Sequence, residues 1–124
     1  MATHEADLHL KKFQKELNAG IVSLVLLATL AAAGEPLYGY QIAKQLEPDT
    51  EDAGPVKQGT LYPVLRALSG AGLLESHVEP SVSGPPRRYY RITGEGRAVL
   101  VQWRRAWTRT RNFVDSVLGD SDHE

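Results

Sequence analysis

Cysteine is absent from this sequence, and its 124 residues leave room for one domain of ordinary size. The lack of cysteine excludes a disulfide framework and a thiolate metal site, and it favours a cytoplasmic location over a secreted one. The four histidines are scattered along the chain, and no pair has the spacing of metal ligands. We therefore expect no metal and no other cofactor.

Recognisable catalytic motifs are lacking as well. The sequence has no Ser-His-Asp arrangement, no glycine-rich loop that would cradle a phosphate and no clear pair of carboxylates. These patterns are the usual marks of nucleophilic, phosphoryl-transfer and acid–base catalysis. We expect that the protein is not an enzyme.

No apolar run is long enough for a confident membrane span. The longest, IVSLVLLATLAAAG at residues 21–34, follows three lysines and resembles the core of a signal peptide. However, Glu5, Asp7 and Glu16 interrupt the would-be positive leader, and the run is shorter than the roughly 20 residues that a span needs. The run therefore predicts a buried helix and no association with a membrane.

Net charge is also almost absent, at −1, but the charges are strongly partitioned. Residues 1–56 carry 4 Lys or Arg against 8 Asp or Glu, residues 57–111 carry 10 against 3, and residues 112–124 carry 0 against 4. The middle segment is thus +7 between two segments of −4 each. A concentrated positive surface indicates a polyanionic partner, although solvated basic helix faces would give the same count.

The hydrophobic spacing predicts a mainly α-helical fold with one small β-hairpin. The acidic stretch at 48–55 is typical of a loop, and the hairpin is formed by strand-like runs at 73–82 and 87–93 around a stiff Ser-Gly-Pro-Pro tip. The expected helices are an amphipathic one at 5–19, an apolar continuation at 20–33, a short helix at 40–47, an amphipathic helix at 57–72 and a long last helix at 94–119.

Two helix starts can be predicted from capping residues. Thr60 is a plausible N-cap for the fourth segment, which would place Pro63 in the first turn, where no intrahelical donor is lost. Thr93 is expected to cap the last helix, with Glu95 in its first turn. In the second strand, the period of two directs Tyr90 and Ile92 toward the core.

The order helix, helix, helix, hairpin, helix is that of a winged helix-turn-helix. The stretches LYGYQIAKQL, GTLYPVLRALSGAGLLE and RRYYRITGEG resemble the second helix, the recognition helix and the wing of the PadR family of bacterial transcriptional regulators. The resemblance covers about residues 20–118 and is closest to the smaller subgroup, which has a single C-terminal helix. It implies a homodimer that binds operator DNA and usually represses, often until a small molecule releases it.

Residues at the start of a recognition helix enter the major groove, and a wing reaches backbone phosphate or the minor groove. Lys57 and Gln58 suit base edges, whereas the hydroxyls of Thr60 and Tyr62 suit phosphate oxygens. The alternative for Tyr62 is a half-buried core position, and the alternative for the wing arginines is a solvated hairpin. The expected contacts with double-stranded DNA are Tyr40, Gln41, Lys44, Lys57, Gln58, Thr60, Tyr62, Arg87, Arg88 and Arg91.

The last helix carries an apolar seam with coiled-coil-like spacing, and we expect nothing within the chain to cover it. It should therefore pair with a second copy, aided by apolar residues of the first helix. The expected dimer contacts are Leu10, Phe13, Leu17, Leu100, Trp103, Trp107, Thr110, Val114 and Val117. Trp103 and Trp107 are also candidates for binding a small aromatic effector, as the resemblance to drug-responsive family members suggests, or they simply fill the dimer core.

The sequence thus divides into four parts by expected role. Residues 1–19 aid dimerisation, 20–93 form the DNA-binding domain, 94–119 form the C-terminal dimerisation helix and 120–124 are an acidic tail. A second hypothesis is a winged-helix module that binds a protein and has no sequence-specific DNA binding, because the fold serves both purposes.

Overall fold

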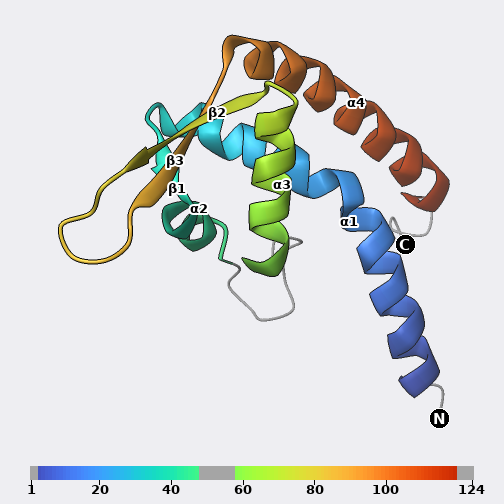
Figure 1. The fold of residues 1–124 in the computed structure, drawn as a ribbon. Coiled ribbons are helices and arrows are strands. Elements are labelled where there is room, and N and C mark those ends of the chain that lie inside the picture. The colour runs from blue at the N-terminus through green and yellow to red at the C-terminus, as the bar shows by residue number, and fades with distance from the viewer. Residues whose placement is uncertain (1–2, 48–57, 120–124) are drawn as a thin grey trace.

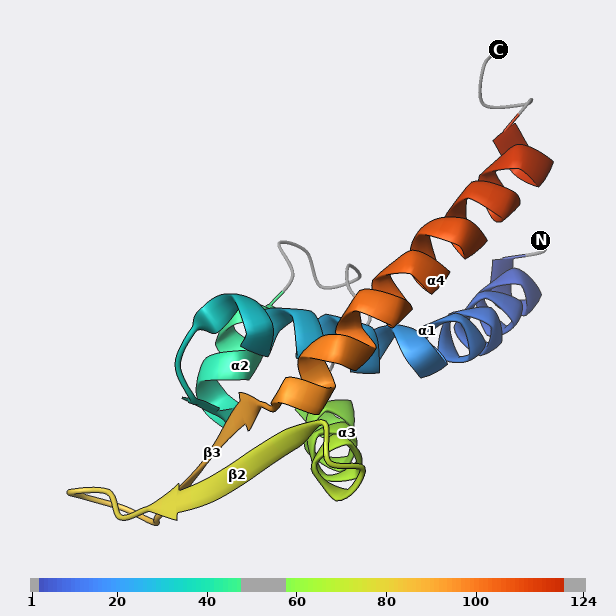
Figure 2. The same ribbon diagram turned by 90° about the horizontal axis from the view of Figure 1, so that it is seen from above.

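The computed structural model describes residues 3–47 and 58–119, and Figures 1 and 2 show the fold from two directions. The predicted loop at 48–55, the predicted DNA contact Lys57 and the acidic tail at 120–124 lie outside this described part. Within it the elements are α1 (Thr3–Ala33), β1 (Leu37–Tyr38), α2 (Gly39–Gln45), α3 (Gln58–Gly70), β2 (Leu74–Glu79), β3 (Arg87–Ile92) and α4 (Gly94–Leu118). The mainly helical fold with a small sheet is confirmed.

Helix α1 is a single helix that joins the predicted segments 5–19 and 20–33. Its first half is exposed, whereas its second half enters the core, where Leu26 and Leu27 are fully buried. By length and composition alone, α1 is apolar enough to cross a membrane. Core helices share these properties, and the packing of Leu26 and Leu27 in this domain accounts for the hydropathy of the second half. Gly34, at a φ of 73°, ends the helix in the left-handed region that favours glycine.

Helices α2 and α3 form the helix-turn-helix and pack against each other, and α3 also packs on α1. Ile42 of α2 and Leu61 and Leu65 of α3 are fully buried. The spacing of these side chains is what the sequence predicts for helices that bury one face and expose the other.

The predicted start of α3 is wrong, because the helix begins at Gln58 and Thr60 is already inside its first turn. Pro63 consequently falls in the second turn and removes an amide donor from the helix. Both Pro63 and Gly59, whose carbonyl lacks that donor, are exposed. Water can therefore satisfy the carbonyl, which is why the helix tolerates proline at this position.

The sheet has three strands rather than the two that the hairpin pattern predicts. The strand order is β1-β3-β2, with both pairs antiparallel. On the inner face, Leu37 lies opposite Tyr90, and both are buried. Tyr90 and Ile92 thus face the core as predicted, with exposures of 4% and 5%. The wing is built on a sheet whose far edge is attached to the start of α2.

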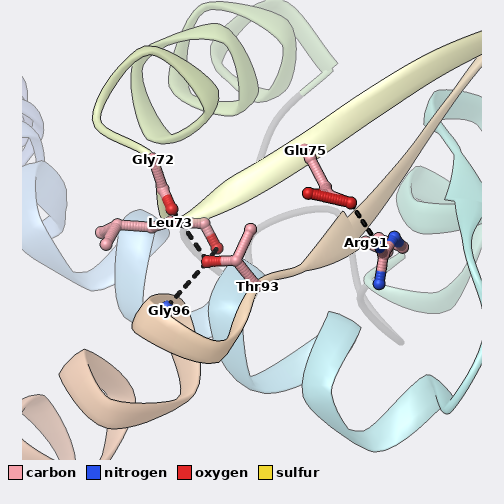
Figure 3. A network of polar contacts seen from close by, with 6 residues as sticks. All are labelled: Gly72, Leu73, Glu75, Arg91, Thr93 and Gly96. Carbon is pink, nitrogen blue, oxygen red and sulfur yellow. Dashed lines mark hydrogen bonds and ion pairs between the residues drawn. The ribbon is translucent and has the colours of Figure 1, made fainter.

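Thr93 joins α4 to the turn that follows α3 (Figure 3). Its Oγ1 accepts a hydrogen bond from the Gly96 N–H at 2.9 Å, which confirms the predicted N-cap. The same hydroxyl lies 2.8 Å from the carbonyl oxygen of Gly72 and 3.1 Å from that of Leu73, so its one proton is donated to this pair. The hydroxyl therefore bridges two elements as well as capping a helix.

The first turns of α4 are covered from within the chain, contrary to our expectation of an uncovered seam. Leu100 is only 5% exposed and lies in the core, with Val99 and Trp103 packed partly against it. The reason is that α4 crosses α1, which covers this end of the apolar stripe. Leu100 is therefore removed from the candidate dimer surface.

Beyond Trp103, α4 leaves the body of the domain. In both views its C-terminal half and the N-terminal half of α1 project away from the hairpin, on the opposite side of the molecule (Figures 1 and 2). Large apolar side chains are exposed on both projecting segments: Leu8, Leu10, Phe13 and Leu17 on α1, and Trp107, Phe113, Val114, Val117 and Leu118 on α4.

Candidate nucleic-acid interface

One side of α3 faces the wing rather than the core. Tyr62, Arg66 and Ser69 follow one another at spacings of four and three, so they lie on the same side of the helix. The Tyr62 ring packs against Gly39, where any Cβ would overlap its atoms, yet the residue is 38% exposed. Tyr62 is thus half-buried, with its ring seated on the start of α2.

Between this side of α3 and the wing lies a hollow of about 700 Å³, partly open to solvent. Three of its lining residues are arginines, and none is acidic. The hollow is lined by Tyr38, Gly39, Tyr40, Tyr62, Arg66, Ser69, Ser76, Pro86, Arg87, Arg88 and Tyr90. It is therefore a positively charged recess with aromatic walls, assembled from β1, α2, α3, β2 and the wing tip.

The side chains of the three wing arginines have three different environments. The Arg87 guanidinium lies over the Tyr38 ring, with its central carbon 4.5 Å from the ring centroid. Arg88 donates from Nη1 to the Ser76 Oγ at 3.0 Å. Arg91 forms an ion pair with Glu75 on the neighbouring strand and does not line the hollow (Figure 3). Only Arg91 has its charge offset by an acid in the described chain.

The outer face of the sheet carries an aromatic row across all three strands. Tyr38 meets Tyr89 edge to face at 5.3 Å between ring centroids, and His77 stacks on Tyr89 at 5.5 Å. The His77 Nε2 lies 2.8 Å from the Glu79 Oε2. On this face Arg91 is paired with Glu75, whereas Tyr38 and Arg87 also border the hollow.

The α2 residues expected to contact DNA have local roles as well. The Gln41 Oε1 accepts a hydrogen bond from the Tyr38 N–H at 3.0 Å, which satisfies an amide at the start of α2. Lys44 lies 3.8 Å from Glu47 in an exposed ion pair. Tyr40 is exposed and stacks on Tyr38 at 6.4 Å between centroids. Of these three predicted contacts, only Tyr40 lines the hollow.

The structure thus gathers four of the predicted DNA contacts around one recess: Tyr40, Tyr62, Arg87 and Arg88. Gln58 begins α3, and Thr60 is exposed two residues before Tyr62. Sequence reasoning missed Tyr38 and Arg66. Arg66 had a usable signal, because it follows Tyr62 by four residues and must share its side of the helix.

The two tryptophans lie on α4, outside this recess. Trp103 packs partly against the core, and Trp107 is 40% exposed on the projecting part of α4. Neither lines the hollow. The expected effector site lies between the tryptophans of one copy and a second copy of the chain, so it would exist only in a dimer.

The arrangement of a helix-turn-helix, a charged recess and a wing agrees with the family comparison. The model described as the Transcriptional regulator PadR-like family matches residues 26–102. The chain belongs to the PadR-like family. This family consists of transcriptional regulators rather than enzymes, which confirms the expectation that the protein is not an enzyme.

Individual relatives of this PadR-like chain support the assignment. The Transcriptional regulator Rv3488 of Mycobacterium tuberculosis is 37% identical over 92 residues, which is 74% of this chain and 79% of that protein. The crystal structure of a PadR family transcriptional regulator from Eggerthella lenta is similar with a TM-score of 0.76 at 33% identity, covering 93% of this chain and 96% of that one. A PadR family transcription regulator from Clostridium difficile has a TM-score of 0.65 at 28% identity, over 80% and 99% of the two chains.

Proposed function

We propose that this chain is a DNA-binding repressor that acts in the cytoplasm as a homodimer. Helix α3 enters the major groove with Gln58 and Thr60 leading, and the wing lies along the adjacent backbone. The observation that carries the proposal is the recess between α3 and the wing, with three arginines and no acid among its lining residues. Such a surface suits the phosphates of a duplex.

The homodimer is supported by the apolar side chains exposed on the projecting halves of α1 and α4. A soluble monomer rarely leaves so many large apolar groups on one side, and a second copy would cover them. The heptad-like spacing of Trp107, Val114 and Val117 suits a helix pair, with Thr110 between them. Leu10, Phe13 and Leu17 extend the same surface.

Two-fold symmetry carries a consequence for the operator. Two copies of α3 related by a two-fold axis read the same bases in opposite directions, so the operator is palindromic. Its half-sites are expected about one helical turn apart, roughly 10 base pairs centre to centre. Repression is the regulatory sense that the family resemblance favours.

A planar aromatic effector is proposed to bind at the dimer seam beside Trp107. A ligand there would release DNA only if it binds the DNA-competent and incompetent dimers with different affinities. The test is whether tryptophan fluorescence quenching saturates at the ligand concentration that releases DNA. The effector site beside Trp107 is ruled out if quenching persists unchanged in Trp107→Phe. It is also ruled out if a screen of flat aromatic compounds leaves DNA affinity unaltered.

DNA binding itself is tested by fluorescence anisotropy with a labelled duplex over a series of salt concentrations. Each phosphate contact contributes about 0.9 to the slope of log affinity against log salt, so several contacts give a steep fall. Binding that is indifferent to salt, or absent at low salt, overturns the proposal. A folded dimer that binds no duplex would instead favour the winged-helix protein-interaction module.

A further inference from the structure

We propose that the hollow between α3 and the wing seats one backbone phosphate of the duplex, held jointly by Arg66 of α3 and Arg88 of β3. This inference rests on the proposed function, since it takes DNA as the partner. It goes further by naming the chemical group that enters the recess and by separating the roles of the two neighbouring arginines at the wing tip.

The charges of Arg66 and Arg88 lack an acid partner within the described chain. Arg66 is exposed and has no ion pair or hydrogen bond there, and Arg88 is bonded only to the neutral Ser76 hydroxyl. By contrast, Lys44 and Arg91 are paired with carboxylates. Arg66 and Arg88 are therefore free to offset the charge of a ligand oxygen with charge-assisted hydrogen bonds.

Residues with neutral hydroxyl groups line the same recess. The Ser69 Oγ is buried and has no hydrogen-bond partner among the described residues, and Tyr62 and Ser76 also line the recess. A buried hydroxyl without a partner is unfavourable, so a partner is expected in the working state. Phosphate oxygens, or a water held by them, would satisfy it.

The geometry of a winged helix on DNA brings a phosphate strand to this recess. When α3 occupies the major groove and the wing reaches toward the adjacent minor groove, the sugar-phosphate strand that separates the grooves must pass between them. The recess lies between these same two elements. The occupant is therefore a backbone phosphate and not a base edge, so this contact positions the protein without reading sequence.

Arg87 also lines the recess, but its environment differs from that of Arg88. Its side chain leaves β3 on the opposite face, since successive residues of a strand point to opposite sides, and its guanidinium lies over the Tyr38 ring. Arg87 is consequently expected to contact a second phosphate or the minor groove independently. This difference supplies an internal control for the experiment.

The test measures duplex affinity against salt for Arg66→Gln, Arg88→Gln and the double variant. If both arginines hold one phosphate, the double variant lowers the salt slope by about 0.9, the value of a single contact. The affinity loss of the double variant is then smaller than the product of the two single losses, each of which we expect to be roughly tenfold. Arg87→Gln combined with Arg66→Gln gives multiplicative losses.

Two results of this salt series overturn the inference, and the Arg66→Lys control described below supplies a third. A slope loss near 1.8 with multiplicative affinity losses means that Arg66 and Arg88 contact separate phosphates. An unchanged affinity in Arg66→Gln means that the recess is not used. If the wild-type protein binds no duplex at all, the proposed function fails first, which distinguishes the two failures.

Matched variants separate charge from folding. Arg104→Gln removes an exposed arginine of α4, on an element that takes no part in the recess, and is expected to leave the slope unchanged. Arg66→Lys keeps the charge at the same helix position and should restore most of the slope. Equal thermal unfolding midpoints for all variants show that the differences in affinity and salt slope arise from DNA contacts and not from folding. If Arg66→Lys fails to restore any of the slope, the charge is not what acts and the inference is overturned.

Discussion

Tyr38 of β1 carries the Arg87 guanidinium over its ring, 4.5 Å from the ring centroid. The same ring meets Tyr89 edge to face, and the backbone N–H of Tyr38 is held by the Gln41 side chain. One tyrosine thus connects the start of α2 to the wing and fixes the direction of a wing arginine. The position of Arg87 relative to the recognition helix depends on this connection.

Replacing Tyr38 with leucine is therefore expected to weaken DNA binding without unfolding the protein. The lost cation–π contact corresponds to about 0.5–1 kcal/mol, which is roughly a two- to fivefold loss of affinity. Fluorescence anisotropy with a fixed duplex at one salt concentration measures it. Tyr38→Phe keeps the ring and should bind like the wild type. Equal losses in both variants would show that the hydroxyl, and not the ring, matters.

Gly96→Ala is expected to destabilise the fold, although alanine is the better helix former. A Cβ at this position would collide with the Leu73 carbonyl oxygen, which is backbone, and with the Ile92 side chain. Overpacking of this kind costs about 1–3 kcal/mol, and urea unfolding at fixed protein concentration measures it. Gly94→Ala, two residues earlier with nothing within 4 Å, is the control and should be neutral or slightly stabilising. Equal behaviour of the two variants contradicts the packing argument.

Val114→Glu should dissociate the proposed dimer. Val114 is exposed on the projecting part of α4, and a second copy would bury a carboxylate there beside its symmetry mate. Sedimentation velocity at micromolar concentration is expected to show a dimer for the wild type and a monomer for the variant. Asn112→Glu adds the same charge on another side of α4 and should leave the dimer intact. A Val114→Glu dimer of unchanged stability places the interface elsewhere.

Gln58→Ala and the paired change of Arg87 and Arg88 to alanine should have different effects. Gln58 begins α3, so its loss is expected to relax discrimination at particular base positions by on the order of 1–3 kcal/mol. The wing variant should weaken binding to all sequences alike, since phosphate contacts carry no sequence information. Comparing operator and random duplex affinities for each variant measures this. If Gln58→Ala weakens binding to all sequences alike and the wing variant loses discrimination, Gln58 contacts phosphate and the wing arginines read bases.

Elements with a strong local signal could be predicted from the sequence. The buried positions of Tyr90 and Ile92 follow from the strand period, and the Thr93 cap follows from its place before a long helix. Strand β1 could not be found this way. Leu37 and Tyr38 are only two residues between turn-forming neighbours, and they become a strand because the free edge of β3 pairs with them.

The candidate site could be predicted only in part, because it too depends on contacts between segments that are far apart in the sequence. Arginines next to one another in the wing are visible in the sequence, but the sequence does not show that Arg87 and Arg88 have different partners across the sheet. The seam was misjudged at Leu100 because an apolar stripe has the same spacing whether its own chain or a second copy covers it. The crossing of α1 and α4 in the structure shows that the same chain covers the stripe at Leu100.

The most direct test of the central claim is the sequence of the fragments that the full chain selects from a pool of random duplex DNA. The account predicts enrichment of a palindrome whose half-sites lie about 10 base pairs apart, as expected for two recognition helices related by a two-fold axis. Gln58→Ala should relax the consensus within each half-site and leave the spacing unchanged. A pool that shows no enriched sequence after repeated rounds, from a protein that is folded and dimeric, would contradict the account.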